Sequence, residues 1–216
     1  MRILLVAATD AEVGNLMSEV DKMTGLGLRT LDFDLLITGV GMVATAFALG
    51  RHLAANKYDI VVNLGIAGSF DRDIALGEIV EITQDTLAEL GAEDDEKFLT
   101  ISHLGFGADT YYPTTKLADL YNLFNNFNLK QVSAITVNTV HGNENSIKKV
   151  AGRIEPQLES MEGAAFFYAC GQYGIPCIQI RAVSNYVEKR NRDKWNIGLA
   201  IKNLNKFAVE FLKLYA

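Results

Sequence analysis

The chain has 216 residues, 49% of them hydrophobic, and a formal net charge of −6 at pH 7. That length suits one domain over residues 1–216, and the negative charge without a Lys- or Arg-rich block argues against a docked nucleic acid polymer. The first apolar run is too short for a secretory signal and no later run is long enough to span a membrane, so we expect a cytoplasmic protein.

Strand and helix signals alternate through the first half of the chain. Ile3–Ala8 is typical of a buried strand, and the helix-capping types Thr9 and Asp10 predict a helix over Ala11–Met23. Small residues at Gly39-Val40-Gly41 interrupt the next strand pattern and predict a tight turn. The other elements expected here are strands at Leu28–Leu31, Phe33–Thr38, Ile60–Ile66 and Ile79–Leu87 and a helix over Met42–Asn56.

The second half of the chain continues the alternation. The acidic stretch Gly91–Lys97 predicts a mobile loop, and Asp193–Leu214 predicts one long closing helix. Strands that alternate with helices predict an α/β fold, and the adjacent short strands favour a mixed sheet. The elements expected between these two segments are helices at Thr115–Phe127, Asn143–Ile154 and Glu162–Gln172 and strands at Val132–Val140 and Ile175–Ser184.

Acidic and amide side chains lie at the ends of these elements. Glu12, at the first strand-to-helix junction, is either a solvated helix-start carboxylate or a general base that activates water. Glu162 opens a helix and is either a helix-start acid or a group that accepts hydrogen bonds from both hydroxyls of a ribose. Asn185 ends the apolar run Ile178–Val183, where its amide can both donate to and accept from one edge of a ligand.

Glycine-rich and charged segments also allow two interpretations. Gly65–Ser69 follows a strand, where small residues either form an ordinary turn or let a flat ligand approach the backbone. Gly39-Val40-Gly41 matches the dinucleotide-binding fingerprint incompletely, because no acidic residue ends the following strand. In the charged run Glu188–Lys194 the side chains are either solvated or hold an anionic substrate group through Arg190 and Arg192.

The cysteines and histidines give no pattern of metal ligands. Cys170 and Cys177 lie in apolar surroundings and are expected to be buried free thiols. The histidines, His52, His103 and His141, have no metal-ligand spacing. We therefore expect neither a zinc site nor a disulfide framework.

Taken in order, four segments resemble the nucleoside phosphorylase/nucleosidase superfamily, and the resemblance covers nearly the whole chain. The segments are Gly39–Ala44, Asn63–Gly68, Glu159–Ala164 and Arg181–Asn185, with Glu12 before them. The resemblance implies a three-layer α/β/α sandwich around a mixed, partly barrel-like sheet. It also implies a homo-oligomer that acts on a small-molecule nucleoside and water, with no metal or organic cofactor.

The chain departs from the phosphorylases of this superfamily where they hold phosphate. Those enzymes use arginines in the first loop and in the strand before the Gly-rich turn, where this chain has Asp10, Glu12 and Asn63. Carboxylates repel phosphate, so hydrolysis by water is the favoured reaction. A purine nucleoside phosphorylase stays an alternative, as does a nucleoside-binding protein without activity.

Asn185 also separates the chain from the adenosine-type nucleosidases, which carry Asp at that position. An amide can donate to O6 or N7 of hypoxanthine, where negative charge collects as the glycosidic bond breaks. Arg181–Val187 followed by Arg190–Trp195 resembles the futalosine hydrolases of the alternative menaquinone pathway. Their substrate is an inosine-like nucleoside that carries a 5′ benzoate. A methylthioadenosine/adenosylhomocysteine nucleosidase stays the alternative.

The resemblance implies roles for particular side chains. Asn185, held by Ser184, would contact the leaving purine, and Glu12 would activate water with Arg181 orienting the acidic groups. Glu162 would bind the ribose hydroxyls. The remaining contacts implied are Met161 below the ribose, Ile66, Ala67 and Val140 as walls of the base pocket, Tyr111, Tyr112 and Pro113 near the 5′ group, and Arg190 and Arg192 at the benzoate.

Overall fold

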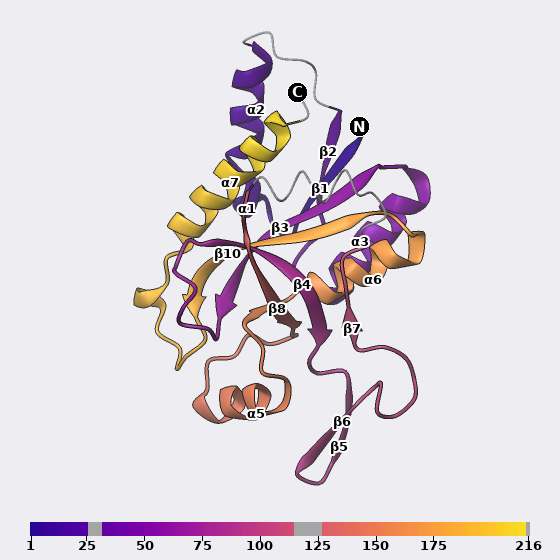
Figure 1. Cartoon of the computed structure of the whole chain (residues 1–216), viewed down its shortest axis with the longest axis vertical. Coiled ribbons are helices and arrows are strands. Elements are labelled where there is room, and N and C mark those ends of the chain that lie inside the picture. The colour runs from indigo at the N-terminus through magenta and orange to yellow at the C-terminus, as the bar shows by residue number, and fades with distance from the viewer. Residues whose placement is uncertain (26–31, 115–126, 215–216) are drawn as a thin grey trace.

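The computed structural model describes residues 1–25, 32–114 and 127–214. At its centre is an eight-stranded sheet in the order β10-β4-β8-β9-β3-β1-β2, with β7 beside β4 (Figure 1). Because β10 also pairs with β3, the strands from β10 to β3 close into a partial barrel. The strands are β1 (Ile3–Ala7), β2 (Phe33–Ile37), β3 (Ile60–Ser69), β4 (Ile79–Leu87), β7 (Thr110–Tyr111), β8 (Lys130–Thr136), β9 (Leu158–Ser160) and β10 (Cys177–Tyr186).

The sheet is mixed, as the sequence predicts. β1 pairs in parallel with β2 and with β3, and β3 pairs in parallel with β10. β10 runs antiparallel to β4, and β3 runs antiparallel to β9. The carboxyl ends of β1, β3 and β10 therefore meet at one edge of the sheet, which is where open α/β sheets bind ligands.

Helices cover both faces of the sheet and complete a three-layer α/β/α sandwich (Figure 1). Successive side chains of β1 point to opposite faces, so Leu5 packs in one core cluster with Leu204 and Leu4 packs in another with Leu49. The fold expected from the sequence is confirmed. The helices of the first face are α1 (Asp10–Val13), α2 (Leu16–Gly25) and α7 (Ile197–Lys213), and those of the second face are α3 (Met42–Ala55) and α6 (Gly163–Tyr173).

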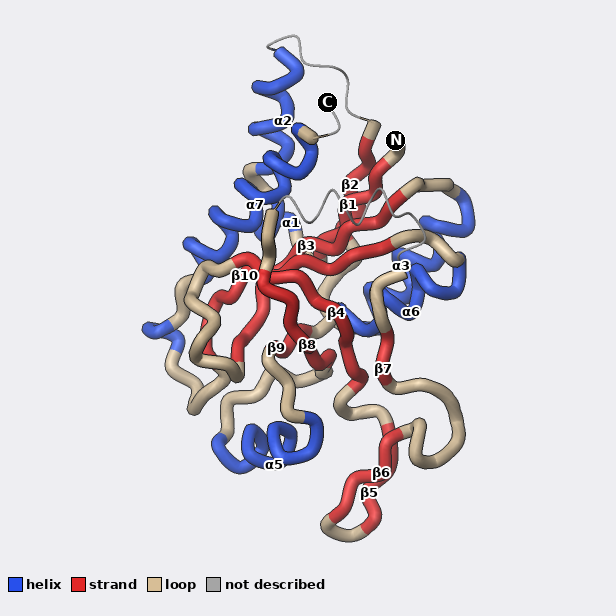
Figure 2. Tube along the Cα trace, viewed as in Figure 1, coloured by secondary structure: helices blue, strands red, loops and turns tan. Residues whose placement is uncertain are grey.

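A hairpin and one further helix lie beyond one end of the sheet (Figure 2). The helix is α5 (Glu144–Ile154), and the hairpin joins β5 (Gly91–Asp94) to β6 (Lys97–Thr100). The hairpin shows that the mobile loop expected at Gly91–Lys97 was wrong. Its exposed acidic side chains hide the strand pattern, whereas backbone pairing across a turn at Asp95, with φ of 55°, joins the two strands.

Two strands end at different places from those expected. β3 continues through Ser69, so Gly65–Ser69 is strand and the interpretation as an ordinary turn was wrong. Pairing on both sides, to β10 and β9, keeps these small residues extended. β8 ends at Thr136 instead of Val140, so Val140 lies in a loop. Both changes affect residues that lie at the ligand-binding edge.

The helices at the two ends of the chain are interrupted. Instead of one helix over Asp193–Leu214, Arg192–Lys194 forms a single 3₁₀ turn and Trp195 is extended. α7 then starts after Asn196, whose side chain accepts a backbone N–H of its first turn. The helix expected over Ala11–Met23 is likewise divided into α1 and α2. Trp195 therefore lies outside both the 3₁₀ turn and α7.

The remaining expectations concern two segments near the described ranges, the cysteines and membrane-spanning helices. The expected strand at residues 28–31 lies outside the described residues, as does the expected helix at residues 115–127 apart from Phe127. Cys170 and Cys177 are buried and free, as expected. Within the described ranges, no helix combines the length and the apolar character needed to cross a bilayer.

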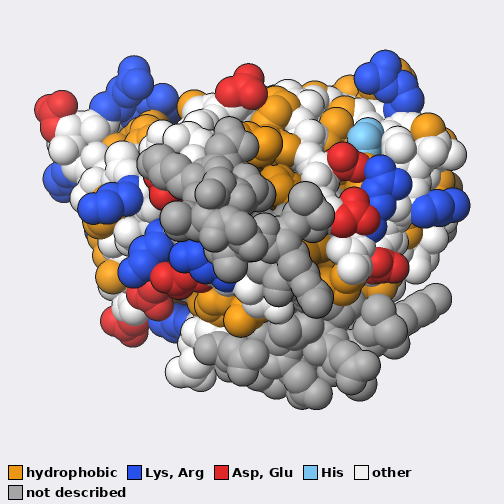
Figure 3. Space-filling model, turned by 90° about the horizontal axis from the view of Figure 1, so that it is seen from above, with side chains coloured by type: hydrophobic (Ala, Val, Ile, Leu, Met, Phe, Trp, Pro, Cys, Tyr) orange, Lys and Arg blue, Asp and Glu red, His pale blue; other side chains and the backbone are white. Residues whose placement is uncertain are grey.

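Basic and acidic side chains are interspersed over the described part of the face seen in Figure 3. Surface ion pairs mix the two signs in the same way. Glu188 lies 2.6 Å from Arg72 and 3.1 Å from Lys194. This mixture differs from the continuous basic stripe of surfaces that bind nucleic acids.

Candidate active site

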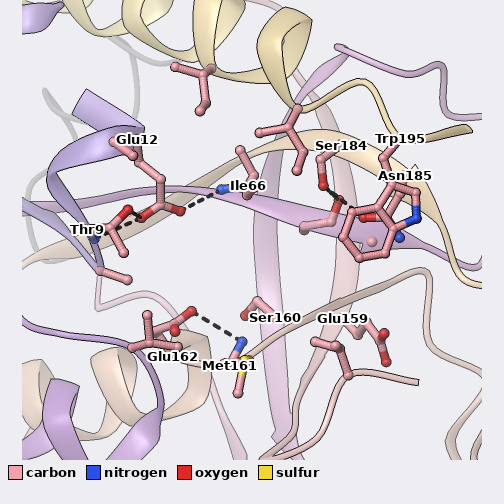
Figure 4. A pocket seen from close by; sticks show the side chains of 18 of the residues that line it. Thr9, Glu12, Ile66, Glu159, Ser160, Met161, Glu162, Ser184, Asn185 and Trp195 are labelled. Carbon is pink, nitrogen blue, oxygen red and sulfur yellow. Dashed lines mark hydrogen bonds between the residues drawn. The ribbon is translucent and has the colours of Figure 1, made fainter. Parts of the chain in front are cut away.

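A cavity of about 310 Å³ opens at the sheet edge where β1, β3 and β10 end (Figure 4). Its other walls come from α1, the turn before α3, the loop after β8, the segment from β9 into α6, and the start of α7. Apolar side chains surround a few polar groups, as in most small-molecule sites. The polar side chains that line it are Thr9, Glu12, His141, Glu159, Ser160, Glu162, Ser184 and Asn185.

Glu12 lies at one end of the cavity, and three donors fix its carboxylate (Figure 4). Oε2 accepts hydrogen bonds from the backbone N–H of Thr9 at 3.0 Å and from the Thr9 hydroxyl at 3.2 Å. Oε1 accepts the backbone N–H of Ile66 at 3.1 Å. The residue is only 8% exposed. The oxygens keep lone pairs that can accept a proton from water, as a general base must.

Glu162 lies across the cavity from Glu12 and directly precedes α6 (Figure 4). Its Oε1 accepts the backbone N–H of Gly41 at 2.9 Å, and its Oε2 accepts that of Met161 at 3.2 Å. Gly41 has φ of 93°, a conformation that favours glycine. The tight turn expected at Gly39-Val40-Gly41 is therefore confirmed, and it also orients a carboxylate in the cavity.

Asn185 reaches the cavity through a β-bulge in β10. Val183 pairs with Ala67 and Asn185 pairs with Gly68, so Ser184 is the extra residue. The Ser184 hydroxyl donates to Oδ1 of Asn185 at 2.9 Å, and Nδ2 of Asn185 donates to the backbone carbonyl of Tyr186 at 3.1 Å. These bonds orient the amide, and its second N–H remains to donate to a ligand.

Glu159 and His141 form a buried pair on the cavity wall. The backbone N–H of His141 donates to Oε1 of Glu159 at 3.0 Å, and His141 Nδ1 lies 2.7 Å from Oε2. Glu159 is 3% exposed. Burial raises the pKa of the Glu159 carboxyl, while the bonds from His141 act in the opposite direction.

Arg181, which the sequence suggests as a catalytic residue, does not line the cavity. It is 2% exposed and lies beneath Gly65, whose missing side chain leaves room for the guanidinium. Nη2 donates to Oδ1 of Asn63 at 2.6 Å, and Nε donates to Oε1 of Gln179 at 2.9 Å. Arg181 thus supports the strands behind Glu12 and acts through them.

The same buried network extends to the start of α6. Nε2 of Gln179 donates to Oδ2 of Asp85 at 3.0 Å, and the Thr136 hydroxyl donates to Oδ1 at 2.8 Å. The Thr136 oxygen also accepts the backbone N–H of Ala164 at 2.7 Å. Burial raises the pKa of Asp85 to about 6. Through Thr136, Asp85 helps to fix the helix start that carries Glu162.

The charged run Glu188–Lys194, here called the basic loop, lies beside the cavity and directly precedes Trp195. The guanidinium of Arg190 is 5.0 Å from the centroid of the indole ring, and that of Arg192 is 5.9 Å from it. Both distances are within the range of cation–π contacts. Trp195 lines the cavity, whereas neither arginine does. The two cations are therefore separated from the cavity by the indole.

The cavity brings together most of the side chains expected from the sequence. Tyr111, Tyr112 and Pro113 instead line a separate surface hollow. Sequence reasoning missed Thr9 and Trp195 as lining residues. It left His141 open between a residue that lines a site and a plain loop histidine, and it assigned no contact to Glu159. The three-residue spacing from Thr9 to Glu12 is typical of a helix start, and it could have predicted the hydrogen bonds between these two residues. The expected residues that do line the cavity are Glu12, Ile66, Ala67, Val140, Met161, Glu162, Ser184 and Asn185.

No group of three His, Cys, Asp or Glu side chains within the described ranges could hold a metal ion. The family model of the phosphorylase superfamily matches residues 35–213, which is more than half of the chain. The chain belongs to the phosphorylase superfamily. Glu162, Asn185 and the strands of the partial barrel lie within the matched residues, whereas Glu12 lies before them.

Futalosine hydrolases and methylthioadenosine/adenosylhomocysteine nucleosidases are among the proteins similar to this chain. The futalosine hydrolase of Streptomyces coelicolor is 34% identical over 178 residues, which cover 80% of this chain and 75% of that protein. The structure of futalosine hydrolase from Helicobacter pylori matches with a TM-score of 0.79 at 14% identity, covering 100% of this chain and 98% of the other. A methylthioadenosine/adenosylhomocysteine nucleosidase from Colwellia psychrerythraea, in complex with adenine, matches with a TM-score of 0.79 at 20% identity, covering 99% and 95%. The two structures establish the shared fold.

Proposed function

We propose that the protein is an N-ribosyl hydrolase that cleaves futalosine into hypoxanthine and dehypoxanthine futalosine, a step of menaquinone biosynthesis. The similarity to the futalosine hydrolase of Streptomyces coelicolor supports this substrate. The composition of the cavity supports the reaction. Three carboxylates and one amide line it, and no Lys or Arg is among its described lining residues. A phosphate co-substrate would face like charges there, whereas water would not.

Glu12 is the proposed general base. The glycosidic bond breaks with its electron pair going to the purine, which leaves an oxocarbenium-like ribosyl cation. A water molecule on Glu12 loses its proton to the carboxylate as its oxygen bonds to C1′. The bonds from Thr9 and Ile66 hold the carboxylate in one orientation for this step.

The proposed ribose and base contacts divide between the two ends of the cavity. Glu162, fixed by Gly41 and Met161, accepts hydrogen bonds from the ribose hydroxyls. Asn185 lies at the other end and donates through Nδ2 to the leaving hypoxanthine, where negative charge develops. Ile66, Ala67 and Val140 supply apolar surface for the rings.

The proposed function of the basic loop is to bind the 5′ benzoate of futalosine. Arg190 and Arg192 lie against the Trp195 indole that lines the cavity, so a carboxylate that extends past Trp195 meets both cations.

A homo-oligomer is also proposed, from the family resemblance. The large exposure of Val43, Phe47 and Phe106 is consistent with a covered apolar face. The cytoplasmic location stays a prediction.

The test is base release from four nucleosides, each with and without inorganic phosphate. The substrates are futalosine, its 6-amino analogue, methylthioadenosine and inosine, and the released base is measured by chromatography. We expect hypoxanthine from futalosine at a rate that does not depend on phosphate. Adenine from methylthioadenosine alone would replace the proposal with the adenosine-type activity. Turnover that requires phosphate would make the protein a phosphorylase.

A further inference from the structure

Two polar side chains flank Gly68 at the end of the cavity away from Glu12. Gly68 of β3 pairs with Glu159 of β9 on one side and with Asn185 of β10 on the other. A Cβ on Gly68 would lie 3.1 Å from Asn185 Nδ2 and 3.5 Å from Glu159 Cγ. Figure 4 shows Glu159, Asn185 and Trp195 together at this end. The missing side chain thus leaves one planar ligand edge within reach of both groups.

The two groups have opposite hydrogen-bonding character. An ionised Glu159 only accepts, and its oxygens have more lone-pair sites than the two that His141 uses. Asn185 presents the second N–H of Nδ2, since the first donates to the backbone carbonyl of Tyr186 and the Ser184 hydroxyl orients the amide through Oδ1. The base end of the cavity therefore presents an acceptor on one side of Gly68 and a donor on the other.

This arrangement matches the edge of a 6-oxopurine and opposes that of a 6-aminopurine. A 6-oxopurine presents a donor at N1 and acceptors at O6 and N7, whereas a 6-aminopurine has a lone pair at N1 and a donor at its exocyclic amine. With the carboxylate facing N1, only the 6-oxopurine forms a bond there. The 6-aminopurine would bring a lone pair against a buried carboxylate, which leaves both groups unsatisfied.

We propose that Glu159 determines the purine specificity of the site by accepting the N1–H of a 6-oxopurine while Asn185 donates to O6 or N7. The inference rests on the proposed function as a purine nucleosidase. His141 is a positioning residue, since its backbone N–H and Nδ1 fix the two oxygens of Glu159. Specificity thus depends on a residue three positions before the ribose-binding Glu162.

Direct binding of the free bases tests this proposal without turnover. Calorimetry gives the Kd of hypoxanthine and of adenine for the wild type and for Glu159→Gln. In the Gln variant the amide oxygen still accepts a hydrogen bond from His141. Its NH₂ group, however, is a donor and faces the N1–H of the 6-oxopurine. We expect the wild type to prefer hypoxanthine. In the variant, the ratio of the Kd for adenine to the Kd for hypoxanthine should fall by roughly 10- to 100-fold. An unchanged ratio in a folded Glu159→Gln protein overturns the proposal.

His141→Asn is the matched control, because its amide can donate to Oε2 as the imidazole does. We expect this variant to keep the preference for hypoxanthine. A lost preference in His141→Asn with a retained one in Glu159→Gln would assign recognition to the histidine and overturn the proposal. If Glu159→Gln does not fold, equal binding of the two bases by the wild type still overturns it. A protein that prefers hypoxanthine but does not cleave futalosine would refute only the proposed function.

Discussion

Gly65 lies in β3 between Glu12 and Arg181, and its replacement by alanine measures how tightly the cavity is packed onto the buried network. A Cβ there would overlap Arg181 Nη1 and would lie 3.1 Å from Arg181 Cζ and 3.2 Å from Glu12 Oε1. The guanidinium cannot simply move away, because Asn63 and Gln179 hold it by hydrogen bonds. The backbone of β3 is equally confined by its pairing with β10.

The expected loss of stability has two parts. Overpacking of a buried site costs about 1–3 kcal/mol. A hydrogen bond to a charged group contributes about 1.5–3 kcal/mol, and displacement of Arg181 weakens at least one such bond. Since the two parts overlap, we expect Gly65→Ala to lower the free energy of unfolding by about 3 kcal/mol. For a chain of this length that corresponds to a fall in Tm of roughly 6–12 °C.

Urea denaturation followed by Trp195 fluorescence measures this loss, and Gly50→Ala is the matched control. Gly50 lies within α3, and a Cβ there meets no atom within 4 Å. Alanine should therefore leave the stability unchanged or raise it by up to about 1 kcal/mol. If Gly65→Ala proves as stable as Gly50→Ala, the packing argument for Gly65 and Arg181 is wrong.

Three further predictions concern catalysis, pH and the basic loop. Glu12→Gln should lower kcat by roughly 10²- to 10⁴-fold with hypoxanthine affinity unchanged, and a near-normal kcat would remove Glu12 as the base. The pKa of Asp85 is raised from 3.8 to about 6 by burial, so its contribution to stability is lost as pH rises from about 4 to 6 and amounts to about 3 kcal/mol. Asp85→Asn should flatten the dependence of the free energy of unfolding on pH in that range. A dependence parallel to that of the wild type would contradict the assignment of this effect to Asp85. Arg190→Ala combined with Arg192→Ala should raise KM for futalosine about 10-fold and leave KM for inosine unchanged; equal effects on both would exclude contact with the benzoate.

The sequence predicted the elements whose signals are local. β4 spans Ile79–Leu87 as expected, and α3 differs from its expected range by one residue, because each element is long enough to show its own sequence pattern. β9 was missed because Leu158–Ser160 is too short to show a period. Its position depends on pairing with β3 and β8, which are distant in the sequence.

The candidate site shows the same division between local and distant information. Glu12, Glu162 and Asn185 could be identified because each lies where a predicted strand or helix starts or ends. The contact between Glu159 and His141 could not, because it joins a short strand to a loop 18 residues away. The burial of Arg181 depends on Gly65, a residue of another strand, and strand alternation alone does not show which buried side chain reaches a cavity.

Because of the bulge in β10, the number of residues between Arg181 and Asn185 decides which side chain enters the site. In a regular strand the residue after Val183 would pair with Gly68, and the extra residue places Asn185 there instead. A substitution at Asn185 exchanges one hydrogen-bonding edge for another, whereas a single insertion or deletion between Arg181 and Asn185 changes which side chain occupies the register. Among relatives, the number of residues in this interval should therefore vary less than their identity, and libraries that redesign base specificity should keep its length constant.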